Sequence, residues 1–422
     1  MEAGDTPLKV FWAAPFKVPY TVPESNVGFR LGPDVHEVVQ QWPECWGVWE
    51  TVTEFITNRD PDVLKVLELA AANRLPVFGS NPMAGGARLA MLAAAGVRLD
   101  HESYDAAELL EKMRAGLYVM IRESAVAHFL EDNIQVVTRL GANPGRVGFC
   151  TDDVTATSIL GGGHLDRLVR MAIAAGVAPI TAIQMATINC AQMYRIDHLV
   201  GSLSPGRAAD VLVIDHPKSF NVEVVVAKGR VAAKAHRSLR PPRAPVRHPA
   251  LLETMRRAPV RAGEIELRTT LSSPVRVLAI EMDPGVPFIR RRHDVELPVV
   301  DGVVQPDPAQ DALYVAVVER YGKNRPAAVA VIRGFGLSSG ALATSAAPDD
   351  NNIVCVGTNA PDMAAAEERL DAAAAKLGCR LPSAFGYLMF LEITSIPDYA
   401  ITDLGLVDCR ALTTVQPVLG PA

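Results

Sequence analysis

The sequence predicts an α/β fold built on an incomplete (β/α)8 barrel of the TIM type, with about six of its eight strands, followed by a C-terminal α+β domain. Short apolar runs alternate with helical patterns through residues 1–200. Four of these runs end in acidic or histidine residues, as strands do at the catalytic face of a parallel barrel. A second alternation of apolar runs begins near residue 263. The 422 residues suffice for two or three domains of about 100–200 residues each.

The predicted barrel strands are short, rich in Val, Phe, Trp or Ile, and bounded by Gly or Pro. Buried parallel strands, which are covered by helices on both faces, have this composition. The runs are LKVFWAAP (8–15), GVWETV (47–52), LPVFGS (75–80), GVRLDHE (96–102), YVMIRE (118–123) and VGFCTDD (147–153).

Helical patterns separate most of these strands. DPDVLKVLELAAANR (60–74) opens at an Asp-Pro pair and has apolar residues spaced i, i+3, i+4. YDAAELLEKMRAG (104–116) ends at a Gly that suits the position after a helix. Residues 164–196 predict one or two further helices. Strands that alternate with helices imply a parallel α/β arrangement.

The number of predicted strands falls short of a closed barrel. A (β/α)8 barrel needs eight strands, whereas the runs before residue 160 supply about six, and the first lies close to the N-terminus. An open sheet of this size exposes two edges and part of its core. We therefore expect the chain to associate, either with copies of itself or with a second chain.

The second half of the sequence predicts two further regions. SLSPGRAADVLVID (202–215) leads into FNVEVVVAKGRVAAK (220–234), which predicts strand, turn and strand. Residues 235–262 mix Arg with Pro and interleave no aromatic residue, which favours a solvated linker over a nucleic-acid-binding patch. The α+β domain then alternates EIELRTTLSS, PVRVLAIEMD, DALYVAVVERYG, AAVAVIRGFGL and NNIVCVGTN with a helical pattern over 362–378.

Composition and charge narrow the possible partners and the compartment. The net charge of −6 argues against nucleic acid as a partner. Six scattered cysteines without a Cys-x-x-Cys motif indicate reduced thiols and a cytoplasmic protein. The first residues, MEAGDTPLKVFW, lack the pattern of a signal peptide, and no apolar run reaches the ~18–20 residues that span a bilayer. We therefore expect no membrane partner.

Carboxylate and imidazole side chains at the ends of the predicted strands form the candidate site. A single carboxylate there could cap the following helix, but four strand ends in register favour one shared site. These groups suit a divalent metal, which lowers the pKa of bound water to about 7, while a free carboxylate moves the proton. The residues are Glu50, the pair His101 and Glu102, Glu123, and the pair Asp152 and Asp153.

Characteristic phrases run through nearly the whole chain: VRLDHES, GLYVMIRES, FCTDD, GGHLDRLVR, MATINCAQMYRI, GSLSPGRAADVLVID, VVERYGKN, GFGLSSGALATSAAPDDNNIVCVGTN and ITDLGLVD. In these phrases the chain resembles the bacterial adenine deaminases, of the metal-dependent amidohydrolase superfamily. The resemblance implies an amidohydrolase barrel portion in residues 1–200, strands of a small β-domain in 201–234, an Arg/Pro-rich linker in 235–262, and an adenine-deaminase-type C-terminal domain in 263–422.

The resemblance also implies a chemistry and the residues that carry it. The activity would be hydrolytic deamination of adenine, or of a related C–N substrate, with a divalent metal (Mn, Fe or Zn). Glu50, His101 and Asp152 match metal-binding positions, and Asp152, His101 and Glu102 match catalytic positions. Arg122, Glu123, His164 and Asp166 match further positions near the mouth of the barrel.

Two departures from the family pattern affect the predicted metal site. The chain starts at about the third strand of the family's barrel, so the His-x-His pair of the first strand has no counterpart. On the fifth strand, Ser80 stands where the family has a histidine, and Phe78 stands where it has an aspartate. Since a serine hydroxyl is a poorer metal ligand than an imidazole, the site could hold one metal rather than two.

Three interpretations follow from these departures. The chain could be one subunit of a split enzyme whose second chain supplies the His-x-His strand. It could be a non-catalytic relative with a scaffold or regulatory role, which the change at Ser80 supports. It could also be a fragment of a longer chain. The substrate stays open in the same way, because the shared chemistry fits either a purine or a cyclic amide.

Overall fold

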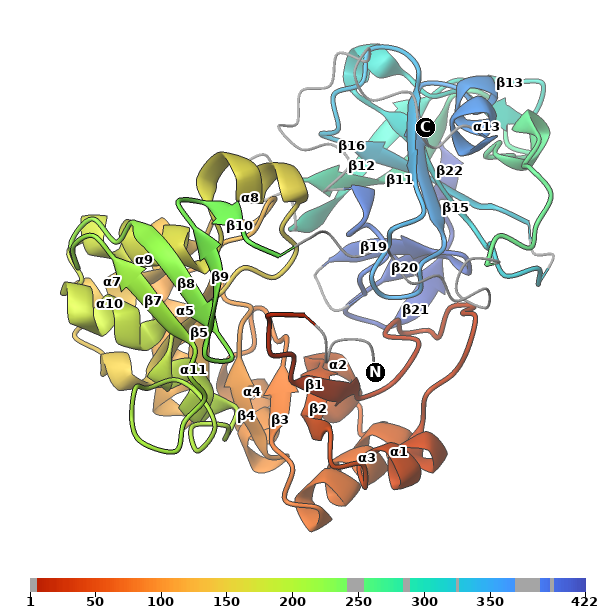
Figure 1. Cartoon of the computed structure of the whole chain (residues 1–422). Helices are drawn as coiled ribbons and strands as arrows, with labels where there is room; N and C mark the ends of the chain where they lie inside the picture. Colours follow the sequence, from red (N-terminus) through yellow and green to blue (C-terminus); the bar gives the residue numbers. More distant parts are fainter. Residues whose placement is uncertain (1–5, 241–253, 284–288, 324–325, 369–387, 395–397) are drawn as a thin grey trace. The chain divides into compact units, whose positions relative to one another are not determined.

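The computed structural model describes residues 6–240, 254–283, 289–323, 326–368, 388–394 and 398–422. The chain forms two compact units (Figure 1). Unit 1 comprises Met1–Lys17 and Leu31–Pro245, and unit 2 comprises Val18–Arg30 and Val246–Ala422. In the described part of the chain, no helix is both long and apolar enough to cross a membrane.

Unit 1 is built around a parallel sheet whose strands lie in chain order. Each strand pairs in parallel with the next, as successive strands of a TIM-type barrel do, so the predicted α/β fold is confirmed. The strands are β1 (Trp12–Pro15), β2 (Cys45–Thr51), β3 (Val77–Gly79), β4 (Val97–Asp100), β5 (Tyr118–Arg122) and β6 (Val147–Cys150).

The helices of unit 1 connect these strands and cover the sheet. In α3 (Pro61–Ala72), the Asp60 side chain accepts a hydrogen bond from the Val63 N–H, and proline occupies the first helical position. The others are α1 (Pro33–Val39), α2 (Thr53–Thr57), α4 (Gly86–Ala94), α5 (Ala106–Arg114), α6 (Leu130–Asn133), α7 (Gln135–Thr138), α8 (Ala156–Gly162), α9 (Leu165–Ala174), α10 (Pro179–Met185) and α11 (Ile188–Met193).

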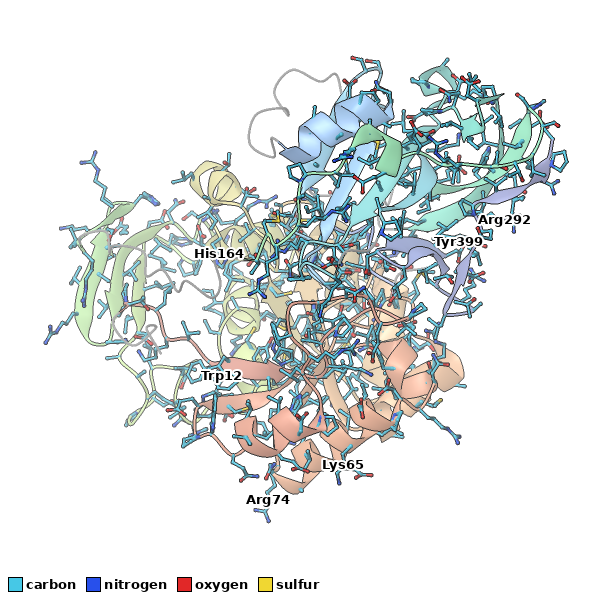
Figure 2. The ribbon with its side chains drawn as sticks, turned by 90° about the vertical axis from the view of Figure 1, so that its right-hand side faces the viewer. Trp12, Lys65, Arg74, His164, Arg292 and Tyr399 are labelled. Atoms are coloured by element: carbon cyan, nitrogen blue, oxygen red, sulfur yellow. The ribbon has the colours of Figure 1, made fainter. Side chains whose placement is uncertain are left out.

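The core of unit 1 lies between the last strands of the sheet and α9. Val119 and Ile121 of β5 and Phe149 of β6 are buried against Leu168 and Val169 of α9. The side chains of Lys65 in α3 and of Arg74, two residues after α3, are exposed to solvent (Figure 2). Burial of the apolar strand residues therefore fixes the sheet from which the site residues emerge.

A small antiparallel sheet follows the barrel portion. Its strands are β7 (Val211–Ile214), β8 (Val222–Ala227), β9 (Arg230–Lys234) and β10 (Arg237–Ser238), in the spatial order β10-β9-β8-β7. The predicted strand, turn and strand at 220–234 is thus present. β10 extends this sheet into the region expected to be linker, because Arg237 pairs with Lys234. Residues 241–253 of that linker lie outside the described residues.

Unit 2 contains a larger mixed sheet in the order β12-β11-β16-β15-β18-β17, with β22 paired to β11. In the adjacent small sheet, Tyr399 lies beside Arg292 of β12 (Figure 2). The strands of the large sheet are β11 (Val275–Met282), β12 (Arg290–Leu297), β15 (Leu313–Val318), β16 (Ala328–Arg333), β17 (Ala341–Thr344), β18 (Ile353–Gly357) and β22 (Val418–Pro421). The smaller sheets hold β13 (Val299–Val300), β14 (Val303–Val304), β19 (Tyr399–Thr402), β20 (Gly405–Asp408) and β21 (Thr413–Val415).

Two expectations for unit 2 are corrected in detail. The run 264–273 is not a regular strand: Glu264 folds back to accept a hydrogen bond from the Arg261 N–H, and only Arg268 forms an isolated bridge, to Val303. The predicted helix at 362–378 begins as α13 (Ala360–Glu368), and its remainder lies outside the described residues.

Residues 18–30 belong to unit 2, although the sequence interpretation placed them in the barrel portion. The Asn26 N–H donates to Asp403 Oδ1 at 3.2 Å, and Asn352 Nδ2 donates to the Asn26 carbonyl at 3.1 Å. The Val22 N–H donates to Thr394 Oγ1 at 2.8 Å. These backbone bonds satisfy polar groups of an irregular segment, which has no apolar periodicity that would have predicted its place.

Candidate metal centre

The site residues emerge from the carboxyl ends of three parallel strands of unit 1. Glu50 lies near the end of β2, His101 follows β4, and Asp152 lies two residues after β6. Because parallel strands all end at the same edge of the sheet, these side chains meet there. The structure thus brings together the residues that the sequence predicted for the metal.

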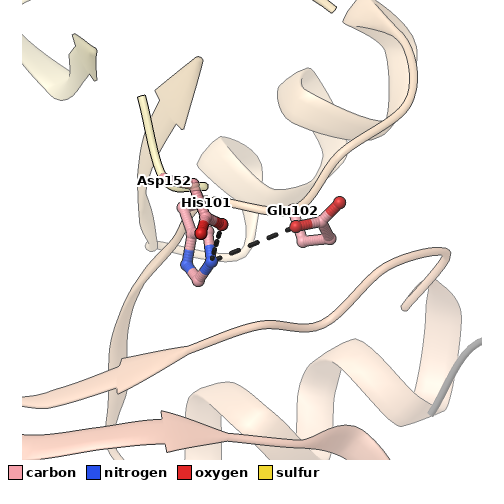
Figure 3. A group of neighbouring side chains, drawn as sticks. All are labelled: His101, Glu102 and Asp152. Carbon is pink, nitrogen blue, oxygen red and sulfur yellow. Dashed lines mark ion pairs between the residues drawn. The ribbon is translucent and has the colours of Figure 1, made fainter. Parts of the chain in front are cut away.

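His101 is oriented by a hydrogen bond from its Nδ1, which lies 2.9 Å from the Gly79 carbonyl oxygen. A carbonyl oxygen only accepts hydrogen bonds, so Nδ1 carries a proton. Nε2, on the opposite side of the ring, faces away from Gly79. Nε2 lies 3.2 Å from Glu50 Oε1. It lies 3.5 Å from Asp152 Oδ2 (Figure 3). The backbone of β3 therefore presents this imidazole to two carboxylates.

Glu102 adds a third carboxylate to the group. Its Oε2 lies 4.0 Å from His101 Nε2, and the ligand atoms of His101, Glu102 and Asp152 all lie within 4.8 Å of one another (Figure 3). An imidazole nitrogen among carboxylate oxygens is the donor set that Zn, Mn and Fe ions take. The residues present thus fit a divalent metal.

The electrostatics of the group also favour a cation. Burial lowers the pKa of His101, but hydrogen bonds to Asp152 and Glu50 outweigh it and raise the pKa well above its usual value. Burial opposes ionisation of Asp152, yet His101 and Arg122 hold the pKa of its carboxyl below the usual range. A negative field strong enough to hold a proton on the imidazole attracts a metal cation as well.

Arg122, at the end of β5, binds three carboxylates at once. Its guanidinium donates to Glu102 and Asp153, and its Nε lies 3.2 Å from Asp152 Oδ2. Burial raises the pKa of Asp153 to about 6, although Arg122 opposes that rise. The guanidinium therefore fixes the positions of the acids around His101 and offsets part of their charge.

The other residues predicted near the barrel mouth join neighbouring networks. Glu123 accepts hydrogen bonds from His128 Nδ1 at 2.9 Å and from Arg167 at 3.1 Å. His164 Nε2 lies 3.0 Å from the hydroxyl of Thr151, the residue before Asp152. Asp166 Oδ1 accepts the His164 N–H at 2.7 Å. His164 therefore supports the segment that carries Asp152, whereas Glu123 contacts other partners.

Ser80 and Phe78 surround the carbonyl that orients His101. The Ser80 N–H donates to the Thr51 carbonyl at 3.0 Å. This bond joins the residue after β3 to the end of β2. Phe78 is buried, and its ring packs edge-on against Tyr194 with centroids 4.8 Å apart. Phe78 and Ser80 therefore lie at the end of β3, on either side of Gly79.

A cavity of about 680 Å³ opens beside Glu50 and His101. Its walls are largely apolar and include the strand residues Trp12, Phe78 and Leu99. Trp12 belongs to β1, which is the first strand in the order of the sheet (Figure 2). Residues 8–13, which include the start of β1, thus line this cavity together with Glu50 and His101.

Two buried cations, Arg122 and Lys112, lie at the site; Arg122 was expected near the barrel mouth, whereas Lys112 was not predicted. Arg122 ends an otherwise apolar strand, which is a signal for a specific ionic partner. Lys112 lies three residues after the buried Leu109, on the apolar face of α5. The i, i+3 spacing from Leu109 could have shown that Lys112 lies on the buried face of the helix, although it does not show which groups Lys112 contacts.

Comparison with known proteins gives matches over both units. Residues 64–232 match the Amidohydrolase family, and residues 287–374 and 365–413 match the adenine deaminase C-terminal domain. The chain is 48% identical to "Adenine deaminase 4" of Rhizobium meliloti (strain 1021), over 100% of this chain and 78% of that protein. It is 46% identical to "Adenine deaminase 1" of Desulfotalea psychrophila (99% and 77%) and 42% identical to "Adenine deaminase 1" of Latilactobacillus sakei (99% and 77%).

The alignment with the Rhizobium protein runs over 469 positions, which is more than the 422 residues of this chain. The relative therefore carries segments inside the aligned region that have no counterpart here. The aligned region leaves about a fifth of the relative's length unmatched.

Proposed function

This chain belongs to the adenine deaminase family, and on that premise we propose that it is a divalent-metal-dependent hydrolase that deaminates adenine. The observation that carries the proposal is the convergence of His101 with Glu50 and Asp152 in a chain 48% identical to an adenine deaminase. In the net reaction, water replaces the amino group of the 6-aminopurine. One C–N bond breaks, one C–O bond forms, and ammonia leaves.

Glu50, His101 and Asp152 would hold the metal, for which we propose Mn, Fe or Zn, with one ion per site. The tautomer of His101, set by the Gly79 carbonyl, directs the Nε2 lone pair toward that position. When bound, a divalent metal supplies Lewis-acid chemistry that makes water acidic enough to act as a nucleophile at neutral pH.

Asp152 and Glu102 are the proposed proton carriers, together with His101 as a catalytic residue. The carboxylates of Asp152 and Glu102 lie 3.5 and 4.0 Å from His101 Nε2, so both are near the place where water would be activated. One carboxylate takes a proton from the water, and that proton is returned to the departing nitrogen. Arg122 holds both carboxylates in place through this transfer.

The test is an assay of the purified chain with adenine, with hypoxanthine and ammonia as the products measured, alongside metal analysis. We expect about one Mn, Fe or Zn ion per chain and conversion of adenine. A chain that holds metal but leaves adenine unchanged and opens a cyclic amide would instead be a cyclic-amide hydrolase. Absence of both metal and turnover would favour the second candidate, a non-catalytic scaffold or regulator, which Ser80 supports through its weak ligand character.

We also propose that another polypeptide completes this site. Among the described strands, β1 pairs with β2 only, and the cavity of about 680 Å³ beside Glu50 and His101 is open next to it. Leu8 and Val10, which line the cavity, are 71% and 58% exposed. A strand added at β1 would cover these apolar residues and satisfy the free edge. That strand could bring the histidines of a His-x-His pair on a second chain.

Light scattering during size-exclusion chromatography tests the need for a partner. We expect the isolated chain to self-associate through its exposed edge, and to hold less metal than a complex with its partner. A stable monomer that is fully loaded with metal and active alone would contradict the need for a partner.

In the same proposal, unit 1 carries the amidohydrolase barrel portion with the small β-domain strands, and unit 2 carries the adenine-deaminase-type domain. The five free thiols of the described residues support a cytoplasmic location.

A further inference from the structure

Lys112 of α5 lies directly behind the segment that carries His101 and Glu102, and its side chain is fully buried. We call residues 100–104 the histidine loop. Lys112 Nζ donates to Asp100 Oδ1 at 2.8 Å, to the Glu102 carbonyl at 2.6 Å and to Ser103 Oγ at 2.9 Å. One ammonium group thus binds residues on both sides of His101 in the chain: Asp100 before it, and Glu102 and Ser103 after it.

The same ammonium reaches a second loop through Glu108. Lys112 Nζ lies 2.7 Å from Glu108 Oε1, which accepts the Met83 N–H at 2.8 Å. Glu108 Oε2 accepts the Tyr104 N–H at 3.0 Å. The buried ion pair of Lys112 and Glu108 on α5 therefore holds two loops. One is the loop after β3, which contains Met83, and the other is the histidine loop after β4.

Asp100 completes the arrangement from inside the histidine loop. Besides Lys112, its Oδ1 accepts the Glu102 N–H at 3.0 Å, which fixes the backbone between the two site residues. Burying a lysine and an aspartate costs free energy, which the surrounding hydrogen bonds must offset. Apolar residues would pack this position at lower cost, so the charges are better explained by the geometry that they impose than by stability.

We infer that Lys112 is a positioning residue for the metal centre, which holds His101 and Glu102 at the geometry that binds the cation. This inference rests on the proposed function for the identity of the site. It goes beyond that function, because Lys112 touches neither the substrate position nor a proposed ligand side chain. Groups that orient metal ligands from behind commonly contribute about 10- to 100-fold to metal affinity.

The test compares Lys112→Met with Lys17→Met in the full chain. Lys17 is a matched control, because it is a buried lysine of unit 1 that bonds Asp60 Oδ2 at 2.7 Å, at the start of α3. Hydrogen–deuterium exchange of the metal-free protein is measured first. We expect Lys112→Met to speed exchange at Met83, Glu102 and Tyr104, while Lys17→Met speeds exchange near residues 60–64 alone.

Metal affinity is measured next, by competition of Zn²⁺ and Mn²⁺ with a fluorescent chelator. We expect Lys112→Met to weaken binding about 10- to 100-fold and Lys17→Met to leave it unchanged. A second variant, Lys112→Arg, separates loss of positioning from loss of folding. It keeps the buried charge, but a planar guanidinium cannot reproduce the four contacts of the ammonium. We expect this variant to melt normally and still bind metal several-fold more weakly.

The outcomes separate this inference from the proposed function. If the unmodified chain binds neither ion, the proposed metal site fails, whereas local exchange in the histidine loop still reports on positioning by Lys112. Unchanged exchange in Lys112→Met, or unchanged affinity in Lys112→Arg, would overturn the positioning role. An equal loss of affinity in Lys17→Met would overturn it as well, since it would show a general effect of a lost buried lysine.

Discussion

At the residue scale, the site depends on a carbonyl and a guanidinium as much as on the groups that would bind metal. The Gly79 carbonyl sets the tautomer of His101, and Arg122 binds the three acids beside it. That Glu50, His101 and Asp152 meet at one edge of the sheet could be predicted from the sequence, because each lies at the end of a recognisable strand run; their role as metal ligands stays a prediction. The roles of Gly79 and Lys112 could not, because a backbone orientation and a contact through α5 exist only in the folded chain.

Asp152→Asn tests the proposed role of that carboxylate. The amide keeps the shape of the side chain but removes the charge that faces His101 Nε2, so we expect turnover to fall about 100- to 10,000-fold and metal content to fall with it. Asp215→Asn is the control, since Asp215 is exposed and, among the described residues, hydrogen-bonds only near the small antiparallel sheet, with Ser219 and Asn221 among its partners. Steady-state kinetics on adenine and metal analysis check both. Equal activity of Asp152→Asn and the unmodified chain would contradict the assignment.

Glu392 of unit 2 makes the stability of the protein depend on pH. Burial raises the pKa of Glu392 well above its usual value, and the neighbouring acids Asp350, Asp349 and Asp403 add to the rise. The folded chain therefore keeps a proton that the unfolded chain releases. As a result, stability falls as the pH rises from the ordinary carboxyl range, near ~4.3, through the raised pKa.

We expect Glu392→Gln to flatten this decline and to raise the stability at pH 8 by about 1–3 kcal/mol, because among the described residues no donor bonds the buried carboxylate, which lies close to other acids. Denaturant unfolding between pH 5 and pH 8 measures the effect. The exposed Glu296, substituted in the same way, is the control. A parallel pH profile in Glu392→Gln and the unmodified chain would show that Glu392 is not the group responsible.

At the scale of elements, local signals in the sequence identify strands and helices well. The six apolar runs of unit 1 all form parallel strands, and both quoted helical patterns form helices. The failures have physical causes that lie outside the segment. Residues 264–273 lack a strand partner beyond one bridge, and residues 18–30 take their place through hydrogen bonds to side chains distant in the sequence.

The start of α5 offers a prediction at this scale. The Asp105 side chain accepts hydrogen bonds from the N–H groups of Ala107 at 2.9 Å and Glu108 at 2.8 Å. Asp105→Ala removes this cap, and we expect a loss of about 1 kcal/mol in the free energy of unfolding. Asp105→Asn keeps an acceptor and should cost much less. Chemical denaturation of the two variants measures the difference, and equal losses would argue against capping.

At the scale of the whole molecule, the proposed metal ligands all belong to unit 1. A ligand that binds one folded unit stabilises that unit by mass action. At 100 times the Kd, Zn²⁺ or Mn²⁺ should therefore stabilise unit 1 by about 2.7 kcal/mol and leave unit 2 unchanged. Calorimetry with and without metal, using His101→Ala to identify the transition of unit 1, provides the measurement. A shift of both transitions in the variant would indicate binding elsewhere.

The membership of residues 18–30 in unit 2 also sets the order in which the protein can be completed during synthesis. Asn26 is made 377 residues before its hydrogen-bond partner Asp403. At about 5–20 residues per second, the early segment waits on the order of tens of seconds for that partner. Unit 1 can assemble its sheet in the meantime, but residues 18–30 cannot dock in unit 2 until Asp403 has been made. The nascent chain therefore carries this segment undocked while the residues between Asn26 and Asp403 are made.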